Sequence, residues 1–294
     1  MTLEQLRIFI AVAEREHVTE AARALHLTQS ATSAAIAALE ERHATKLFDR
    51  IGRRIVLTAA GQAFLAEAKS VLARAADAEA LLADLAGLKA GRLALAASQT
   101  IGNYWLAGPI HRFHQHFPGI SVSLTIANTE VVAQQVIDGI ADLGLVEGEV
   151  ADPALIIEPV GEDELVLVVR PDHPWVAAPP VFPAAFAEAK WVVREAGSGT
   201  RSVFESMLAL DGIAPETLHV TLEMPTNESV RSAVEVGAGV AVLSRLVAVR
   251  AIESGRLKAL DAGLPKRPFL ALRHRERYHT RAAAEFLAGL SAPG

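Results

Sequence analysis

The chain has 294 residues, enough for two domains, and hydrophobic residues make up 51% of it, enough for sizeable cores. It contains no cysteine, which excludes disulfides, thiolate metal sites and a cysteine nucleophile. The net charge of −6 excludes a generally basic protein. The start, MTLEQLRIF, has no signal-peptide pattern, and no run approaches the roughly 18 apolar residues of a membrane span, so we expect a cytoplasmic protein with no membrane partner.

The charge is unevenly distributed along the chain. Residues 1–58 contain eight Lys or Arg against seven Asp or Glu, a balance of +1, so the remainder carries −7. Within 42–54 there are five basic residues and one acidic residue, Asp49. A basic segment this local suits contact with nucleic-acid phosphates, although a solvated charged face is the simpler alternative.

The first 58 residues show the pattern of a winged helix-turn-helix. A first helix carries an apolar stripe at helical spacing, formed by Leu3, Leu6, Phe9, Ile10 and Ala13. Thr19 is the expected N-cap of a second helix and Thr28 that of a third, with Leu27 in the turn between them. The basic segment FDRIGRRIVLT follows at 48–58. This arrangement places the third helix in the major groove of DNA.

The third helix begins at Gln29 and has two distinct faces. Thr32, Ile36 and Leu39 can face the core, whereas Gln29 and Ser33 share another face with Ala37. Gln can bond adenine through two hydrogen bonds, and Ser can bond bases or phosphates; simple helix capping is the alternative for Gln29 and Ser30. The candidate DNA contacts are Thr28, Gln29, Ser30, Thr32, Ser33, Arg50, Arg53 and Arg54.

A long helix is expected after Thr58, its N-cap, running to about Lys89. Its apolar residues alternate in steps of four and three, as in a coiled-coil seam: Phe64, Ala68, Val71, Ala75, Ala78, Leu82 and Leu85. This seam favours self-association, and the alternative is a helix packed on its own domain. Dimerisation would place two recognition helices on two half-sites of an operator.

From residue 92 onward, short apolar runs alternate with helical patterns, which predicts a parallel α/β architecture. A helix is expected after Ser98, Gln99 and Thr100, running through about His116, and another, capped by Asn128 and Thr129, ends at Gly139. The predicted strands are LALAA (93–97), SVSLTI (121–126), DLGLV (142–146), LIIEPV (155–160), ELVLVVR (164–170), WVVR (191–194), GVAVL (239–243) and FLALR (269–273).

Polar residues follow two of these strands, where ligands of α/β folds sit near helix N-termini. Ser98, Gln99 and Thr100 follow the first strand. Gly197, Ser198, Gly199, Thr200 and Arg201 follow the WVVR strand and could form an anion cradle, or simply a Gly-rich turn with an ordinary N-cap. Further candidate effector contacts at strand-to-helix junctions are Asn128, Thr129, Glu147 and Asn227. Glu147 would pair with an arginine across the site or bind a cationic part of the ligand.

Other chemistry finds little support in the sequence. His111, His114 and His116 do not share one helix face and have no acidic partner close by, so we expect no metal site. The chain has no Walker A loop, dinucleotide fingerprint or nucleophile elbow, and no paired nucleophile and base. We therefore expect no cofactor and no enzymatic activity.

The chain resembles the LysR-type transcriptional regulators over its whole length. The motif elements are LEQLRIFIAVAE (3–14), TEAARALHLTQSATSAAIAALE (19–40) and LFDRIGRRIVLTAAG (47–61). The resemblance implies a winged helix-turn-helix over 1–58, a linker and dimerisation helix over 59–90, and an effector-binding domain over 91–294. That domain resembles periplasmic binding proteins, with lobe I at 91–161 and 268–294 and lobe II at 162–267. One departure is Ala34, where such proteins often carry Arg after the Ser of the recognition helix.

The resemblance also implies a function. We expect a regulator that binds double-stranded DNA at a near-palindromic operator as a homodimer or homotetramer. Its effector would be a small anion, either an oxyanion or a phosphorylated or carboxylated metabolite. The segments SQTIGNYWLAGPI and REAGSGTR resemble the branch that regulates sulfur, nitrogen and carbon assimilation. The alternative is a solute-binding module for a small anion without DNA function.

Overall fold

The computed structural model describes residues 1–51, 54–85, 91–180 and 184–290. The chain forms two compact units, Met1–Leu82 and Ala83–Gly294, called unit 1 and unit 2 below. Helix α4 (Ala59–Leu85) extends across the boundary between them. No helix in the described ranges is long and apolar enough to cross a membrane.

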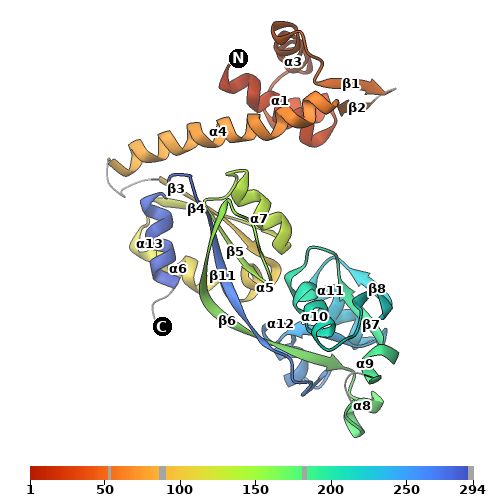
Figure 1. Ribbon diagram of the computed structural model, residues 1–294. Helices are drawn as coiled ribbons and strands as arrows, with labels where there is room; N and C mark the ends of the chain where they lie inside the picture. The colour runs from red at the N-terminus through yellow and green to blue at the C-terminus, as the bar shows by residue number, and fades with distance from the viewer. Residues whose placement is uncertain (52–53, 86–90, 181–183, 291–294) are drawn as a thin grey trace. The chain divides into compact units, whose positions relative to one another are not determined.

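Unit 1 is a winged helix-turn-helix, as the sequence predicts (Figure 1). Its elements before α4 are α1 (Leu3–Arg15), α2 (Val18–Ala24), α3 (Gln29–His43), β1 (Phe48–Ile51) and β2 (Arg54–Leu57). The three helices enclose a core around Leu6, Phe9 and Ile36. Strands β1 and β2 pair antiparallel and form the wing, with Arg50 opposite Ile55. Residues 52 and 53, between the two strands, lie outside the described part of the chain.

A few residues form the caps of α2 and α3 and the turn between these two helices. Thr28 caps α3, accepting from the Ala31 amide at 3.2 Å, as predicted. The predicted N-cap of α2 is wrong: the cap is His17, whose Nδ1 accepts from the Glu20 amide at 3.3 Å, because Thr19 already lies inside the first helical turn. His26 closes the turn with a left-handed φ of 55°.

Helix α4 begins where the sequence predicts, but only part of its predicted coiled-coil seam is free to pair with a second chain. Thr58 Oγ1 accepts from the Gly61 amide at 2.9 Å, and the helix is described to Leu85, so the predicted end near Lys89 lies outside the described residues. Phe64 packs against Phe9 with ring centroids 4.9 Å apart, and Ala68 is 1% exposed. These two seam positions therefore belong to the core of unit 1. Farther along, Leu82 and Leu85 are 68% and 76% exposed.

Unit 2 is built on a seven-stranded sheet (Figure 1). Six strands lie in the order β10-β6-β11-β5-β3-β4, and β9 pairs with β6. Their bounds are β3 (Gly91–Ser98), β4 (Ile120–Ala127), β5 (Leu143–Glu147), β6 (Leu155–Val169), β9 (Ala241–Ser244), β10 (Lys258–Leu260) and β11 (Lys266–His274). A separate parallel pair consists of β7 (Lys190–Arg194) and β8 (His219–Met224).

The expectation of parallel strands holds only for part of unit 2. Strands β3, β4 and β5 are parallel, as are β7 and β8, whereas β6 is antiparallel to β9, β10 and β11. The two strands predicted at 155–160 and 164–170 form one continuous strand, β6. The pairing of β11 with β6 has a register shift between Phe269 and Leu270.

The long strands β6 and β11 connect two halves of unit 2. The first half contains β3, β4 and β5, with α5 (Gln99–Tyr104), α6 (Ala107–His116), α7 (Thr129–Ile137) and α13 (Arg281–Leu290). The second half contains β7 to β10, with α8 (Pro174–Ala177), α9 (Ala184–Glu188), α10 (Gly199–Leu210), η1 (Pro215–Thr217), α11 (Asn227–Glu235) and α12 (Arg245–Glu253). The single helix predicted between Thr100 and about His116 is two helices, of which α5 already begins at Gln99. The chain turns at Trp105, which packs against Phe269 with ring centroids 5.2 Å apart.

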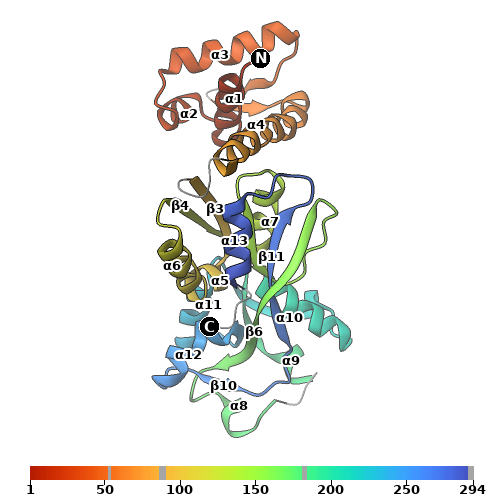
Figure 2. The same ribbon diagram turned by 90° about the vertical axis from the view of Figure 1, so that its left-hand side faces the viewer.

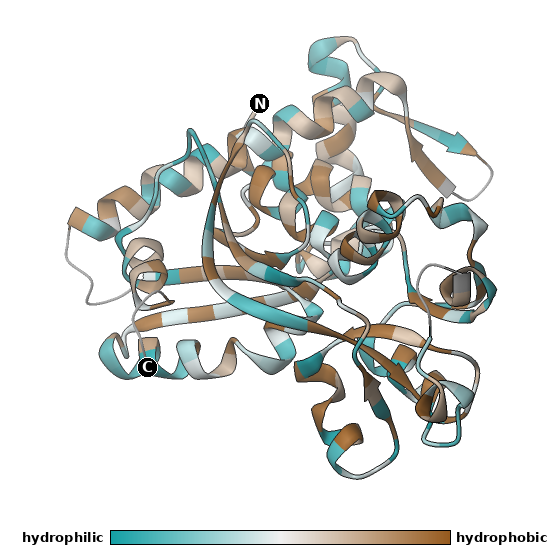
Figure 3. Ribbon diagram, turned by 60° about the horizontal axis from the view of Figure 1, so that its bottom comes forward, coloured by the Kyte–Doolittle hydropathy of each residue, from teal (hydrophilic) through white to brown (hydrophobic). Residues whose placement is uncertain are grey.

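Each half has its own hydrophobic core. In the first half, α6 and α13 cover one face of the sheet and α7 the other (Figure 2). In the second half, Trp191 and Phe204 lie in one cluster and Val234 and Leu243 in another. The helices alternate between apolar and polar bands, as expected for elements with one face buried (Figure 3). Both halves present the ends of strands and the N-termini of helices to one another.

Candidate functional site

The exposed face of α3 is the candidate DNA-reading surface of unit 1. Gln29 and Ser30 in its first turn are exposed, and the hydroxyls of Thr28 and Ser30 lie 3.1 Å apart. Ser33 is half-buried and Ala34 is exposed. This face carries small polar groups and no charge in its first two turns, so any strong phosphate contact has to come from elsewhere in the unit.

Thr32 is not a DNA contact. Its side chain is 0% exposed, and its hydroxyl donates to the Thr28 carbonyl at 3.1 Å. Its other predicted role is confirmed, because Thr32, Ile36 and Leu39 together form the buried face of α3. The same helical spacing that brings Thr32 to the core face excludes it from the DNA face.

The wing carries the basic residues. Arg50 lies on β1 with its side chain exposed. Arg53 lies outside the described residues, and for Arg54 the structure describes the backbone position on β2 only. The wing is attached to α3 through Glu40, which is 8% exposed. Its Oε1 accepts from the amides of Leu47 and Phe48 at 2.8 and 3.1 Å.

Glu40 was missed by the sequence analysis, although it holds the recognition helix and the wing together. Its Oε2 also accepts from Lys46 Nζ at 2.8 Å. Burial raises the pKa of the Glu40 carboxyl, but the hydrogen bonds from Lys46, Leu47 and Phe48 and the charge of Lys46 outweigh it, so the pKa lies below its ordinary value. A glutamate at an apolar-face position, directly after Leu39, is the signal that could have identified it.

In unit 2, predicted effector residues from both halves meet in a buried polar cluster. Asn227, at the start of α11, donates from Nδ2 to Thr100 Oγ1 at 3.1 Å. The Asn227 amide donates to Gln99 Oε1 at 3.0 Å, and Gln99 Nε2 donates to the Pro225 carbonyl at 2.9 Å. The residues of the cluster, each at most 5% exposed, are Ser98, Thr100, Thr129, Glu147, Asp163, Arg194, Ser198, Thr200, Asn227 and Arg267.

Glu147 lies inside this cluster at the carboxyl end of β5. The Ser98 hydroxyl donates to its Oε2, and Arg267 Nη2 lies 3.8 Å from its Oε1. The expectation that Glu147 pairs with an arginine is therefore confirmed, with Arg267 as the partner. The carboxylate is 3% exposed, so its negative charge acts at short range on anything that binds beside Ser98.

The N-terminus of α10 packs directly on β5. An added Cβ at Gly199 would lie 1.8 Å from the Glu147 carbonyl oxygen, so only glycine fits there. Thr129 Oγ1 donates to the same carbonyl at 2.8 Å. Ser198, the N-cap residue, makes no side-chain capping bond, and the first-turn amides of a helix have no partner within the helix. The hydroxyl of Ser198 and these amides are thus available as hydrogen-bond donors.

A second contact between the halves involves Asn128 and the turn before α10. Asn128 caps α7, accepting from the Val131 amide at 3.0 Å, and its Nδ2 donates to the Ala196 carbonyl at 3.3 Å. Gly197 has a left-handed φ of 81°, and an added Cβ would lie 2.7 Å from Glu130 Oε2. Asn128 and Gly197 therefore hold the two halves together rather than join the buried hydroxyls.

Arg267 is the main residue of the cluster that the sequence analysis missed. It donates from Nη1 to Thr200 Oγ1 at 3.2 Å and from Nε and Nη2 to Asp163 Oδ2 at 2.9 and 2.6 Å. Ser244 donates to the other oxygen of Asp163 at 2.7 Å. An arginine immediately before the apolar segment PFLALR gives little indication of a site residue in the sequence. Only the pairing of β11 with β6 shows that its side chain is buried.

The predicted role of Arg201 as a fixed charge in the anion cradle is wrong. Arg201 donates to Glu205 at 2.6 Å, to Glu223 at 2.6 Å and to the Arg194 carbonyl at 3.0 Å. These partners lie on α10, β8 and β7, and the two carboxylates neutralise the charge of the guanidinium. Arg194 is buried instead, and its guanidinium bonds Glu195 at 2.7 and 2.8 Å and also Asn227.

The cluster therefore offers an incoming ligand neutral donors rather than a free cation. Arg267, Arg194 and Arg201 are each bonded to a carboxylate. Beside the cluster, Tyr104 donates to Glu228 at 2.7 Å, and burial together with this bond raises the pKa of Tyr104 to about 12. Within the described residues, no group of three His, Asp or Glu could hold a metal ion.

The fold and these two sites define a winged helix-turn-helix protein with an attached effector-type α/β unit. Residues 3–62 match the family model of the bacterial regulatory helix-turn-helix proteins of the lysR family, and residues 86–292 match the LysR substrate binding domain. The chain belongs to the LysR-type transcriptional regulators, and it is a DNA-binding regulator with an effector-binding domain.

Two relatives are similar in sequence to this chain over nearly the full length of both proteins. The HTH-type transcriptional regulator YeiE of Escherichia coli K12 is 34% identical over 289 residues, covering 98% of this chain and 96% of the relative. The RuBisCO operon transcriptional regulator of Allochromatium vinosum is 32% identical over 287 residues, covering 97% of this chain and 94% of the relative.

Solved structures show the same fold. CbnR in complex with its target DNA has a TM-score of 0.69 at 22% identity, covering 99% of this chain and 100% of CbnR. The regulatory domain of Synechocystis CcmR in complex with 2-PG has a TM-score of 0.62 at 28% identity, covering 68% of this chain and 96% of that domain.

Proposed function

We propose that this regulator is controlled by a small anionic effector that binds at the buried polar cluster of unit 2. The two halves would act as lobes, with lobe I at 91–161 and 268–294 and lobe II at 162–267. The observation that carries the proposal is that Ser98, Thr100, Ser198 and Thr200 converge from separate segments of the chain at the N-termini of α5 and α10. Hydroxyls and helix N-termini together are suited to hold a small anion.

Glu147 restricts which anions fit. A ligand that replaces the Ser98 contact meets a buried carboxylate, and two close negative charges in a poorly solvated site repel strongly. An oxyanion or acid that can donate a hydrogen bond to Glu147 avoids this cost. The CcmR domain solved with 2-PG and the RuBisCO operon regulators support a metabolite of carbon assimilation as the effector. A metabolite of sulfur or nitrogen assimilation rests on the sequence resemblance alone.

We further infer that the chain reads a near-palindromic operator as a homodimer or homotetramer, and that it acts as a regulator rather than an enzyme. The contacts would come from Gln29, Ser30 and Ser33 on α3 and from the arginines of the wing. The exposed Leu82 and Leu85 of α4, with Val71 and Ala78, would form the dimer seam, since Phe64 and Ala68 are already used in the core of unit 1.

A thermal-shift series with sulfite, sulfate and phosphate tests the effector proposal. A ligand that binds only the native state raises its stability by about 2.7 kcal/mol at a hundredfold excess over the dissociation constant. Tryptophan fluorescence reports on the effector unit, because Trp105, Trp175 and Trp191 all lie in unit 2. We expect a stabilising anion whose effect is lost in Thr200→Ala and Ser98→Ala. Anion stabilisation that survives both substitutions would remove the cluster as the site.

The solute-binding alternative without DNA function is tested separately by a gel shift with the upstream promoter region. Retention that prefers this sequence and weakens with salt supports the regulator.

A further inference from the structure

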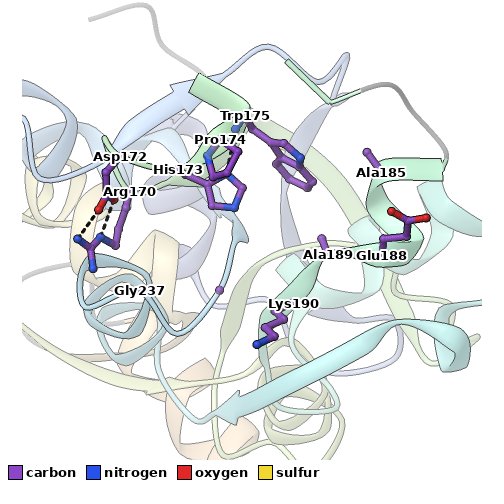
Figure 4. A pocket seen from close by; sticks show the side chains of 11 residues that line it. Arg170, Asp172, His173, Pro174, Trp175, Ala185, Glu188, Ala189, Lys190 and Gly237 are labelled. Carbon is purple, nitrogen blue, oxygen red and sulfur yellow. Dashed lines mark hydrogen bonds and ion pairs between the residues drawn. The ribbon is translucent and has the colours of Figure 1, made fainter. Parts of the chain in front are cut away.

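A cavity of about 540 Å³ lies in the second half of unit 2, and its wall includes Arg170, Trp175, Glu188 and Lys190 (Figure 4). The Arg170 guanidinium is already bonded to both oxygens of Asp172, at 2.9 and 2.7 Å. The Lys190 ammonium group points away from Trp175 (Figure 4). These polar groups do not converge on one ligand, so the cavity defines no chemical class of partner.

The exposed face of α3, in contrast, has a partner of known class, because the chain is a DNA-binding regulator. Helix α3 packs on α1 and α2 (Figure 2), and its buried face contains Thr32, Ile36 and Leu39. Side chains are rotated by about 100° per residue along an α-helix, which places Ala34 about 190° from the centre of that face. The exposed Ala34 therefore points directly away from the core of unit 1.

The side chains around Ala34 are short. Ser30 lies one turn before it and Ala37 three residues after it, and both are exposed on the same side of α3. Between Gln29 and Glu41 the sequence contains no Lys or Arg. Because no long side chain surrounds Ala34, its methyl group can come within van der Waals distance of base edges when the N-terminal part of α3 enters the major groove.

The chemistry of an alanine methyl group selects one base. In the major groove, guanine is read by Arg or Lys, adenine by Asn or Gln, and cytosine by a carboxylate, each through hydrogen bonds. Thymine is the only one of the four bases that presents a methyl group there, and small apolar side chains contact it. Ala34 has neither a donor nor an acceptor on its side chain. Of the four bases, thymine therefore offers the best contact for it.

We propose that Ala34 is a specificity-determining residue, whose methyl group packs on the C5 methyl group of one thymine in each half-site. The inference rests on the proposal that α3 reads a near-palindromic operator. It adds the base that is read at the centre of the exposed face, where the contact is apolar and carries no charge. Cytosine at the same position would present a C5 hydrogen in place of the methyl group and lose this contact.

Uracil replacement tests the contact, because uracil lacks only the C5 methyl group of thymine. Selection by the full chain from a pool of randomised duplexes provides the probe, and each thymine of the selected duplex is then replaced in turn. We expect one position in each half-site where the replacement raises Kd about fourfold, equivalent to about 0.8 kcal/mol for one buried methyl group. Cytosine at this position should also weaken binding, and 5-methylcytosine should recover part of the loss.

The variant Ala34→Gly assigns the contact to this residue. It should bind the thymine and uracil duplexes equally at that position, because the protein methyl group is gone. Ala38→Gly, at another exposed alanine of α3, is the matched control for the loss of helix propensity. The control should weaken binding to both duplexes alike and keep the fourfold ratio. The ratio of the two Kd values does not respond to a purely structural effect on α3.

Three results would overturn the proposal. Uracil without effect at every position would exclude a methyl contact. A fourfold ratio that persists in Ala34→Gly would assign the methyl contact to another residue. Binding of the 5-methylcytosine duplex that is no tighter than that of the cytosine duplex would also count against it. Selection that enriches no sequence would remove the operator proposal as well, whereas an enriched sequence without methyl sensitivity overturns the role of Ala34 alone.

Discussion

Arg267 and Asp163 face each other at directly opposite register positions of β11 and β6. The guanidinium donates twice to one carboxylate oxygen, at 2.9 and 2.6 Å, and the two side chains are 2% and 1% exposed. The pair lies where the two long strands connect the halves of unit 2. It also fixes the hydrogen bond from Arg267 to Thr200, so the strand register and the candidate effector site depend on the same residue.

Replacing Arg267 with methionine should strongly destabilise unit 2. The substitution leaves Asp163 buried without its partner, which costs about 3–5 kcal/mol. Urea unfolding followed by tryptophan fluorescence measures the loss, because the three tryptophans lie in unit 2. The double variant Arg267→Met with Asp163→Leu should recover most of it. A single-variant loss within about 0.5 kcal/mol, typical of surface changes, would contradict this account.

Gly199→Ala should force α10 away from β5. The added methyl would lie 1.8 Å from the Glu147 carbonyl oxygen and 2.7 Å from Thr129 Oγ1, and overpacking of this kind costs about 1–3 kcal/mol. The anion-dependent thermal shift should be lost as well. Gly289→Ala in α13 is the matched control, because an added Cβ there meets no atom within 4 Å and alanine favours a helix by about 0.5–1 kcal/mol. The opposite ranking of the two variants would refute the packing argument.

Glu40→Gln should loosen the attachment of the wing in a pH-dependent way. Because the folded-state pKa of Glu40 lies below its ordinary value of 4.5, the charged form stabilises the fold above that pH, and this contribution is lost as the pH falls through the lowered pKa. Hydrogen bonds to a charged group contribute about 1.5–3 kcal/mol, so the variant should be less stable near neutral pH and the difference should shrink in acid. Amide exchange of Leu47 and Phe48 measures this locally, and a difference that stays constant with pH would count against it.

Replacing Arg50, Arg53 and Arg54 with alanine should weaken DNA binding for all sequences alike. Each lost phosphate contact lowers the slope of log affinity against log salt by about 0.9. Gel shifts over a range of salt concentrations measure the slope, with Arg256→Ala in unit 2 as the control for loss of an arginine outside the wing. An unchanged slope would remove the wing from the DNA contacts.

The N-terminal unit could be predicted closely from the sequence. Helix periodicity, the Thr28 cap and the basic segment gave its fold, because these signals are local to a few turns of chain. The incorrect predictions concern residues whose role depends on packing against other elements. The sequence pattern fits Thr32 both to the core and to DNA contact, and only the packing of α3 shows that its side chain is buried. Phe64 and Ala68 matched a dimer seam but pack inside unit 1.

In the effector unit, the hydroxyls and glycines that follow the strands can be identified from the sequence, because strand ends and helix caps are encoded within a few residues. The pairing of the charged side chains, in contrast, depends on the tertiary fold. It pairs Arg267 with Asp163 across 104 positions of sequence, brings Glu147 beside Ser98 and directs Arg201 to Glu205 and Glu223. Ion pairs between residues so far apart depend on strand register and burial, and neither is contained in a local sequence pattern.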